Sequence, residues 1–547
     1  MLTRTLLAVA VATLPVISAQ VVGKAFGMAT GTTGGGDARP QIPVDYKELK
    51  SLLSDDVPRV IVIDKEWDFT NTEGTVTTSG CEPRACPVSA GGQNLLGTLN
   101  CPDASNDKDV LLSSIEYDAA TDTPLKVASN KTLLGRGPSA TIAGKGLDLS
   151  GSSNIIVQNL HITDLNPKSV WGGDAITLDG TDRVWIDHCT FSLIGRQMLV
   201  SGWNAAGRVT ISSNEFDGRS PWSRTCNGEH YWAILLIGAD DRYTFHGNWL
   251  HDISGRAPHY GTDKNGATNV FHAVNNLFEN MSGHAFDAEP STWSLIEGNT
   301  FINVSQPMTG YSLERANSIF DVPVGSEGDC EVYIGRKCEL NSLDSDSGKL
   351  GEVRDIDALK RVAKEAGETL VVAKPAKDVA ASVRANAGAG RLSEDKPVES
   401  SSAVVVVKST TIPTPTPARY NVTSSATPSQ NSASKTYSLS KEEAVVSLTL
   451  PVASPVAASS WAPTSAASIA AIPTSTCKLC YSQKQAQLHQ RCGGSGWAGP
   501  TTCARAQLRI EVLLVIKWAI YKDHQLGIGK INRYMTQTAV EVLHLPL

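Results

Sequence analysis

The sequence of 547 residues has few charges and few aromatic side chains. Charged residues make up 19% and aromatic residues 6%, and 48 Lys and Arg against 55 Asp and Glu leave a formal charge of −7. No basic stripe is present, so nucleic acid is not expected as a partner. With 41% hydrophobic residues, the composition also argues against a coiled coil, a collagen-like rod and a wholly disordered chain.

Long apolar runs are missing after the first 19 residues. Residues 1–19 carry Arg4, an apolar run over residues 6–17, and then Ser18 and Ala19. This pattern is typical of a secretory signal peptide cleaved before Gln20. The apolar run is too short for a membrane anchor. We therefore expect a secreted, extracellular protein without a membrane partner.

Secretion would place the cysteines in an oxidising compartment. The chain has 11 cysteines, an odd number that cannot pair completely. In an oxidising compartment, cysteines are expected to form disulfides. Four sequons also permit N-glycosylation in that compartment, at Asn130, Asn280, Asn303 and Asn421.

The chain is too long for one compact core, which indicates several modules or one extended repeat. Residues 20–392 have a globular composition. Residues 393–476 shift to Ser, Thr, Ala, Val and Pro and include TTIPTPTPA. Such a stretch buries too little apolar surface to fold, so an extended, O-glycosylated linker is favoured over a β-rich second domain.

A loose repeat runs through the globular part. Short β-branched or aromatic segments each contain one polar residue at a similar place, at steps of 29, 26, 34, 28 and 23 residues: Asn159, His188, Asn214, Asn248, Asn276 and Asn299. A variable step predicts a solenoid whose loops differ in length. Asn at one place in each coil can stack as a hydrogen-bond ladder and tolerates a left-handed corner.

These features predict an all-β fold, a parallel β-helix with long loops on one side. A β-sandwich with similar strand spacing is the alternative, but hairpin signals such as Asn-Gly between adjacent strands are scarce. One convincing helix follows over residues 355–368, with Asp355 placed to cap it.

Long loops on one face of a solenoid form a groove suited to an extended polymer. Three clusters fall where such loops should meet: VWGGDAITLDG (170–180), SLIGRQ (192–197) and SGRAPHY (254–260). GEHYW (228–232) adds aromatic residues beside them.

These segments resemble the pectin lyases of filamentous fungi, in polysaccharide lyase family 1, which also holds the pectate lyases. The resemblance begins near ATGTTGGGDA (29–38), includes WGGDAITLDGTDRVWIDH (171–188), and ends near VRANAGAGRL (383–392). It implies a right-handed parallel β-helix in a monomeric, endo-acting enzyme. Such an enzyme cleaves methyl-esterified pectin by β-elimination and leaves unsaturated ends.

The resemblance also implies roles for individual residues. Arg256 matches the Arg of a GRxP motif that removes the C5 proton, although an Arg pKa is ordinarily about 12.5. Arg196 matches a second cleft Arg, which lowers this pKa and stabilises the enolate. Asp174 matches a cleft carboxylate that positions one or both of these arginines. The implied substrate-binding residues are Trp171, Tyr231, Trp232 and His259. His259 stands where the family usually has Lys and would carry charge only below about pH 6.5.

Calcium-dependent pectate lyase is the enzyme alternative. Those relatives hold calcium with clustered carboxylates, whereas Arg196 puts a fixed positive charge at a ligand position. We therefore expect no metal and no cofactor. A catalytically weakened pectin-binding β-helix is the non-enzyme alternative, because of His259 and because the loop from Cys81 to Cys101 contains no Trp.

By the same resemblance, three disulfides are expected, Cys81–Cys101, Cys86–Cys226 and Cys330–Cys338, with Cys189 a free buried thiol. Beyond the linker, CGGSGWAGPTTCA (492–504) resembles the opening of the small fungal cellulose-binding module. The expected later cysteines and tyrosines are missing from this incomplete segment (477–504). An aberrant tail (505–547) follows, and we expect this end of the chain to be disordered or unable to bind cellulose.

Overall fold

The computed structural model describes residues 20–97, 101, 108–202, 204–262, 267–290, 292–314 and 318–392. The predicted signal peptide (1–19), linker (393–476), incomplete cellulose-binding segment (477–504), tail (505–547) and Asn421 lie outside the described residues. No helix within the described ranges is long and apolar enough to cross a membrane.

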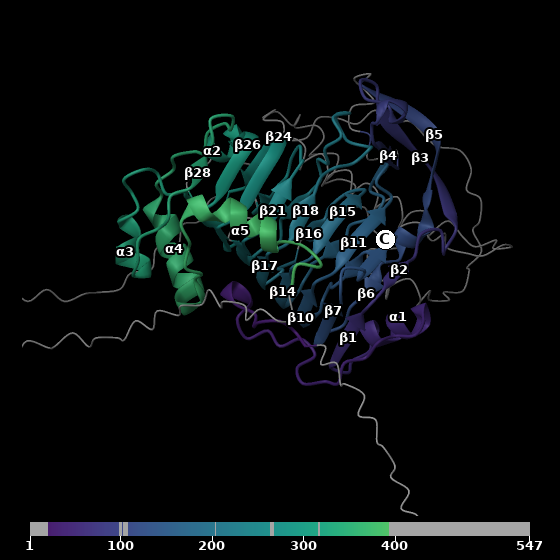
Figure 1. The fold of residues 1–547 in the computed structure, drawn as a ribbon. Coiled ribbons are helices and arrows are strands. Elements are labelled where there is room, and N and C mark those ends of the chain that lie inside the picture. The colour runs from purple at the N-terminus through teal and green to yellow at the C-terminus, as the bar shows by residue number, and fades with distance from the viewer. Residues whose placement is uncertain are drawn as a thin grey trace, which may run out of the picture. The chain divides into compact units, whose positions relative to one another are not determined.

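The described chain forms a parallel β-helix, in which successive coils add strands to three stacks (Figure 1). The first stack is a sheet of nine strands, all paired in parallel. In spatial order it contains β1 (Arg59–Ile63), β7 (Lys131–Gly135), β10 (Ser153–Gln158), β14 (Asp182–Asp187), β17 (Arg208–Ser212), β20 (Arg242–His246), β23 (Asn269–Val274), β25 (Thr292–Glu297) and β27 (Ile319–Phe320).

The second and third stacks merge through β24, which continues from one into the other. The second stack contains β2 (Glu66–Asp68), β8 (Thr141–Ala143), β11 (His161–Leu165), β15 (Thr190–Ile194), β18 (Glu215–Asp217), β21 (Trp249–His251), β24 (Leu277–Ala288), β26 (Thr300–Met308) and β28 (Ser342–Leu343). The third contains β6 (Leu125–Lys126), β9 (Leu147–Asp148), β13 (Ile176–Thr177), β16 (Leu199–Ser201), β19 (Ile234–Leu236) and β22 (His259–Tyr260).

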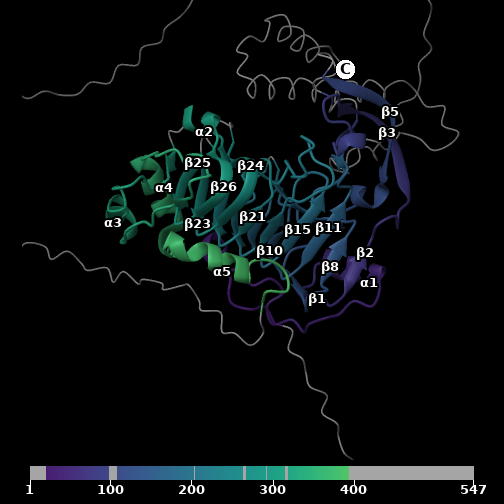
Figure 2. The ribbon, with the colours of Figure 1, turned by 45° about the horizontal axis from the view of Figure 1, so that its top comes forward.

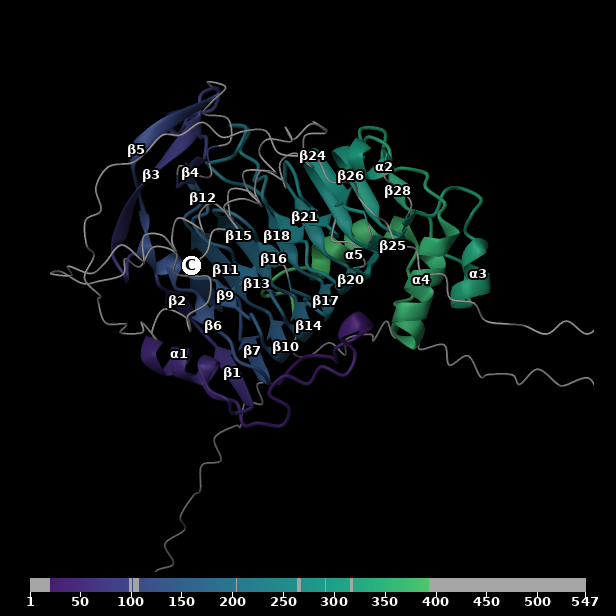
Figure 3. The ribbon, with the colours of Figure 1, turned by 180° about the vertical axis from the view of Figure 1, so that it is seen from behind.

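Smaller elements surround these stacks. A separate sheet contains β3 (Thr75–Pro83), β4 (Asn94–Leu96), β5 (Asp109–Asp118) and β12 (Ser169–Val170). Figures 2 and 3 show α1 at the β1 end of the coils and α3 and α4 at the opposite end. The helices are α1 (Tyr46–Ser54), α2 (Gly310–Glu314), α3 (Asp329–Ile334), α4 (Ile356–Ala366) and α5 (Val379–Asn386).

Inside the coils, like side chains stack on like. Phe191 and Phe216 are register partners on β15 and β18, with ring centroids 5.1 Å apart. Phe278 and Phe301 repeat this arrangement on β24 and β26 at 4.8 Å. All four rings are fully buried. Stacked aromatic residues add to the energy of their buried area, so each coil helps fix the register of the next.

The predicted asparagine ladder is confirmed for Asn214, Asn248, Asn276 and Asn299. Each of these side chains donates from Nδ2 to the Oδ1 of the next, at 3.0, 2.9 and 2.9 Å. Asn341 extends the ladder by one coil, accepting from Asn299 at 3.0 Å. These buried amides therefore pair with one another and with backbone groups, which satisfies the polar atoms that burial would otherwise penalise.

The prediction was wrong for Asn159 and His188, which lie one residue before the ladder position. Both have left-handed backbones, with φ of 60° and 49°. Cys189 occupies the ladder position instead, and its backbone N–H donates to Asn214 Oδ1 at 2.8 Å. The ladder and the left-handed corner thus occupy adjacent positions of each coil. Because the repeat varies in length, the sequence alone could not distinguish these two positions.

The remaining fold predictions within the described residues are confirmed. Helix α4 begins after Asp355, whose carboxylate accepts from the N–H groups of Asp357 and Ala358. All three predicted disulfides are present, Cys81–Cys101, Cys86–Cys226 and Cys330–Cys338. Cys189 is free and buried.

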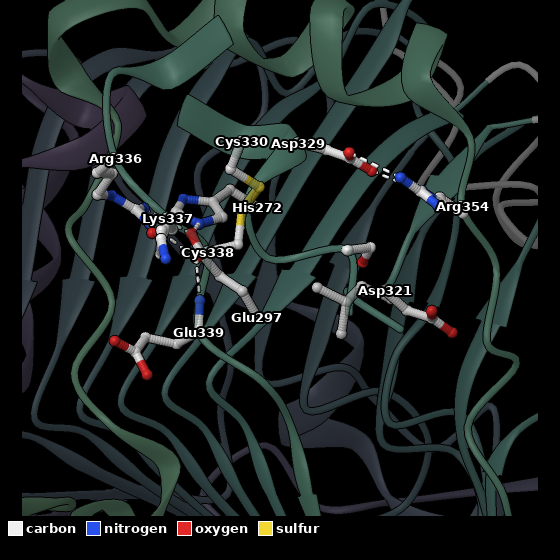
Figure 4. Close-up of a disulfide and its surroundings, with 12 residues drawn as sticks. His272, Glu297, Asp321, Asp329, Cys330, Arg336, Lys337, Cys338, Glu339 and Arg354 are labelled. Atoms are coloured by element: carbon white, nitrogen blue, oxygen red, sulfur yellow. Dashed lines mark hydrogen bonds and ion pairs between the residues drawn. A yellow bond between two sulfur atoms is a disulfide. The ribbon is translucent and has the colours of Figure 1, made fainter. Parts of the chain in front are cut away.

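A buried ionic network lies beside the Cys330–Cys338 disulfide (Figure 4). Arg336, within the disulfide loop, donates to the two carboxylate oxygens of Glu297 at 2.6 and 2.9 Å. The ring of His272 makes a third hydrogen bond to Glu297 at 2.9 Å. Burial alone would raise the pKa of Glu297, but hydrogen bonds from Arg336 and His272 outweigh it and lower that pKa to about 2.

We expect Glu297→Gln to lower the free energy of unfolding by roughly 3 to 5 kcal/mol at neutral pH, because Arg336 would lose its buried counter-charge. Glu297 has a folded-state pKa of about 2. Its charge therefore contributes stability above its unfolded pKa of about 4.3, and this contribution is lost as pH falls toward the folded value. The wild-type advantage should shrink accordingly in denaturant titrations at decreasing pH.

Glu331→Gln is the matched control, because the Lys337–Glu331 pair belongs to the same disulfide loop but is solvent-exposed. It should leave the stability nearly unchanged. Equal losses in the two variants would contradict the importance of the buried network.

Candidate active site

The predicted cleft residues lie just before successive strands of the third stack. Asp174 precedes β13, Arg196 precedes β16, Trp232 precedes β19 and Arg256 precedes β22. Backbone hydrogen bonds continue the parallel register back to this level, from Ala175 to Gln197 and from Ile234 to Arg256. Four consecutive coils thus align Asp174 and Arg256, which are 82 positions apart in sequence, at one level of the stack.

Arg196 is held from two sides. Its Nη1 donates to Asp174 Oδ2 at 2.9 Å, and its guanidinium lies 3.8 Å from the ring centroid of Trp171. The other carboxylate oxygen of Asp174 accepts from the backbone N–H of Gln197 at 2.9 Å. Trp171 as a whole remains 46% exposed. Arg196 therefore offers a fixed positive charge beside an exposed aromatic surface.

A glycine before Arg196 allows this close fit. A Cβ added at Gly195 would lie 2.5 Å from the carbonyl oxygens of both Asn166 and Ser169. The backbone N–H of Gly195 donates to the Leu165 carbonyl at 2.7 Å. Any side chain here would push Arg196 away from Asp174, which explains the Gly-Arg order.

Arg256 has different surroundings. Its guanidinium carbon lies 4.9 Å from the ring centroid of Trp232. No carboxylate oxygen of the described residues lies within the 4.0 Å ion-pair distance of this guanidinium. Its backbone is left-handed, with φ of 52°, and its carbonyl accepts from Ile234 N–H at 2.7 Å. A non-glycine residue in this conformation is held there by its neighbours.

Asp174 was predicted to position one or both of the two arginines. In the structure it contacts Arg196. The strands that follow Arg196 and Arg256, β16 and β22, are separated by β19. With strands about 4.8 Å apart, the two backbones are roughly 10 Å apart. The positive group close to Arg256 in the stack is instead His259, three residues further along the chain.

The structure buries His259, and its predicted contact with substrate stays a prediction. Its side chain is 4% exposed, and its two ring nitrogens lie 2.6 Å from Asp287 Oδ2 and 3.4 Å from Glu289 Oε1. Burial would lower the pKa of His259, but hydrogen bonds to Asp287 and Glu289 outweigh it, so that pKa is raised. His259 is therefore a buried cation that keeps its charge to higher pH than the sequence predicted.

Sequence reasoning missed Asp287 and Glu289. It also missed two histidines, His230 and His284, which contact the backbones of the two arginines. Tyr231 packs edge-on against Trp232 and His284, at 4.9 and 5.9 Å. His230 hydrogen-bonds through Nε2 to the Arg196 carbonyl at 2.7 Å. One signal was available, because Asp287 follows His259 by 28 residues, the same step that separates Asn248 from Asn276 in the ladder.

One group of possible metal ligands occurs among the described residues, away from the third stack. Ligand atoms of Asp217, His251 and Asp252 lie within 4.8 Å of one another. They are already engaged, because Arg219 donates to both oxygens of Asp217 and the His251 ring contacts Asp252 at 2.8 Å. Their own charges are thus largely balanced without an added ion.

The predicted sequons within the described residues differ in exposure. Asn280 and Asn303 are exposed, and Asn303 Nδ2 donates to Asn280 Oδ1 at 3.3 Å. Asn130 is half-buried and accepts from Asn154 at 2.8 Å. Glycosylation at these positions stays a prediction.

We expect the imidazoles of the site to titrate far apart. Burial lowers the pKa of His230 and of His284 to about 4, whereas Asp287 and Glu289 raise that of His259 despite its burial. NMR of the ring nitrogens should show His259 protonated above pH 6.5, its ordinary pKa, while the other two remain neutral. Asp287→Asn should lower the His259 pKa and leave that of His230 in place. Titration of His259 below pH 6.5 in the wild type would contradict this assignment.

Comparison with known proteins gives matches over two parts of the chain. Residues 103–321 match the family described as pectate lyase, and residues 488–506 match the fungal cellulose binding domain. The second match agrees with the resemblance seen in the sequence and lies outside the described residues. A solved pectate lyase from Bacillus sp. N165 aligns at 17% identity with a TM-score of 0.40, covering 67% of this chain and 99% of that one.

Curated relatives match over most of their length. The probable pectin lyase F-1 of Aspergillus terreus is 50% identical over 378 residues, 69% of this chain and 96% of that protein. The probable pectin lyase E of Aspergillus fumigatus is 50% identical over 376 residues, 68% of this chain and 96% of that protein. With this identity across nearly whole relatives and a parallel β-helix fold, the chain belongs to the fungal pectin lyase family.

Proposed function

We propose that this chain is a secreted, endo-acting pectin lyase that cleaves methyl-esterified galacturonan without a metal, with Arg256 as the base. One observation carries the proposal, the contrast between the two cleft arginines. Arg196 is paired with Asp174, whereas the Arg256 guanidinium has no carboxylate partner among the described residues. A guanidinium without a counter-charge loses its proton more readily than a paired one.

The reaction is a β-elimination. Neutral Arg256 accepts the C5 proton of a galacturonate ester, whose adjacent carbonyl makes this proton acidic. The electron pair left at C5 forms the C4–C5 double bond, the C4–O4 bond breaks, and the departing oxygen takes a proton from solvent. The positively charged His259 lies three residues further along the chain, so the base works close to a second buried positive charge.

Arg196 stabilises the charge that develops on the ester carbonyl. Asp174 and Trp171 fix the guanidinium before substrate binds, so little reorganisation is needed as the enolate forms. In a calcium-dependent enzyme a carboxylate such as Asp174 would be expected to ligate the metal, but here it is already paired with Arg196.

The aromatic side chains favour an esterified substrate. Trp171 exposes nearly half of its surface, and Tyr231 and Trp232 lie together beside Arg256. Aromatic faces suit neutral sugar esters better than charged galacturonate. We also propose that the protein is a monomer whose catalytic domain is formed by residues 20–392. The linker (393–476), the incomplete cellulose-binding segment (477–504) and the tail (505–547) are proposed to follow it.

The substrate class is tested by following the ultraviolet absorbance of the unsaturated product on esterified pectin and on polygalacturonate, each with and without chelator. Product from esterified pectin, unaffected by chelator, is expected. Product from polygalacturonate alone, lost on chelation, would identify a pectate lyase. Binding of pectin without product would identify a weakened binding protein.

We expect Arg256→Gln to lower kcat on esterified pectin by at least about 10²-fold, because proton transfer by a positioned base is lost. Arg196→Gln should lower kcat by about 10²- to 10³-fold through loss of charge stabilisation. Arg208→Gln is the matched control, since Arg208 pairs with Asp182 at the exposed start of β17. It should keep wild-type kcat, and circular dichroism should show all three variants folded. Wild-type kcat in Arg256→Gln would disprove the assignment of the base.

We expect His259→Lys to extend activity to more alkaline pH. Above its raised pKa, His259 loses its charge, and the site then lacks the buried cation between Asp287 and Glu289. A lysine would keep its charge to about pH 10. The test is the rate on esterified pectin measured across alkaline pH. Asp287→Asn should move the alkaline loss of activity to lower pH. An unchanged profile in His259→Lys would refute the hypothesis.

A further inference from the structure

We propose that His284 is a positioning residue, which fixes the backbone of Arg256 by accepting a hydrogen bond from its N–H. The backbone N–H of Arg256 donates to His284 Nε2 at 2.9 Å. This inference rests on the proposed function, because it concerns the residue assigned as the base. It adds a component of the site that acts on Arg256 alone.

The side chain of His284 replaces a backbone partner at this point of the coil. One residue later, Ala257 N–H donates to the Ala285 carbonyl, so the regular ladder between coils resumes. At Arg256 itself, the left-handed φ of 52° turns the peptide, and the imidazole takes up the N–H. With Ile234 N–H on the Arg256 carbonyl, both polar atoms of this residue's backbone are engaged.

The imidazole is aimed by a local irregularity in β24. The register between β24 and β26 shifts between Met281 and His284. Such shifts often redirect a side chain near an active site. Gly255 lies against both rings, because a Cβ there would lie 2.5 Å from Tyr231 and 3.1 Å from His284. Tyr231 packs edge-on against the imidazole, with ring centroids 5.9 Å apart.

The surrounding charges keep the Nε2 lone pair available. The ionisable groups that face His284 are Tyr231, Arg256, His259 and Asp287, and Asp287 Oδ2 lies 3.9 Å from Nε2. Burial is the main cause that lowers the pKa of His284 to about 4, and the positive Arg256 and His259 add to it against Asp287. The neutral ring therefore carries its proton on Nδ1 and accepts at Nε2.

His284 is not placed to act as the base, because its Nε2 lone pair is used by the Arg256 N–H. Protonation at Nε2 would put two donors face to face and break the contact. Removing the acceptor should let the Arg256 backbone leave its left-handed conformation, which displaces the guanidinium from the C5 proton. Displacements of about 1 Å cost on the order of 10²-fold in rate.

The test uses the full chain and esterified pectin, with three variants. His284→Ala should lower kcat by about 10²-fold and leave KM nearly unchanged, since substrate contacts remain. His284→Gln, whose amide oxygen can accept the same N–H, should restore most of kcat. It should also extend activity below pH 4, where the wild-type ring protonates. His161→Gln is the control, because His161 bonds Ser192 on the second stack, and it should keep wild-type kcat.

Thermal unfolding should show all three variants folded. Wild-type kcat in His284→Ala would overturn the inference, as would a folded His284→Gln that is as slow as His284→Ala. If Arg256→Gln is inactive while His284→Ala is fully active, the proposed function stands and the positioning role fails. If Arg256→Gln keeps wild-type activity, the base assignment fails and the positioning role fails with it.

Discussion

The parallel hydrogen-bonding between coils is the constraint on which the structure depends. Each interior strand satisfies its backbone groups on the strands before and after it, so one coil cannot shift without breaking two ladders. The buried asparagine ladder from Asn214 to Asn341 adds a side-chain version of the same rule. Residues that occupy equivalent places in successive coils therefore become neighbours, and the residues of the candidate site share this alignment.

The chemistry of the cleft depends on how local charges are matched, since the net charge of −7 says little about it. Arg196 is matched by Asp174, His259 is matched by two carboxylates, and Arg256 faces an aromatic ring. Two basic groups are thus kept charged and one is left without a counter-ion. Acid–base chemistry depends on such differences in the surroundings of neighbouring groups.

The geometry of the backbone also positions the two arginines of the site. Each cleft arginine follows a glycine that is pressed against neighbouring atoms, at Gly195 and Gly255. Each arginine also has one backbone group engaged by an imidazole, the carbonyl of Arg196 by His230 and the N–H of Arg256 by His284. Both arginines are thereby held by rigid neighbours, which is the preorganisation that the proposed reaction needs.

The sequence by itself determined the solenoid, the helix capped by Asp355 and the disulfides, because these follow from periodic pattern, local capping and recognisable motifs. Only the tertiary structure decided that Asn159 lies beside the ladder and that His259 is buried between carboxylates. The physical reason is the same in both cases. Coils of unequal length leave the register undefined until strands pair, and a pKa depends on neighbours that only this pairing brings together.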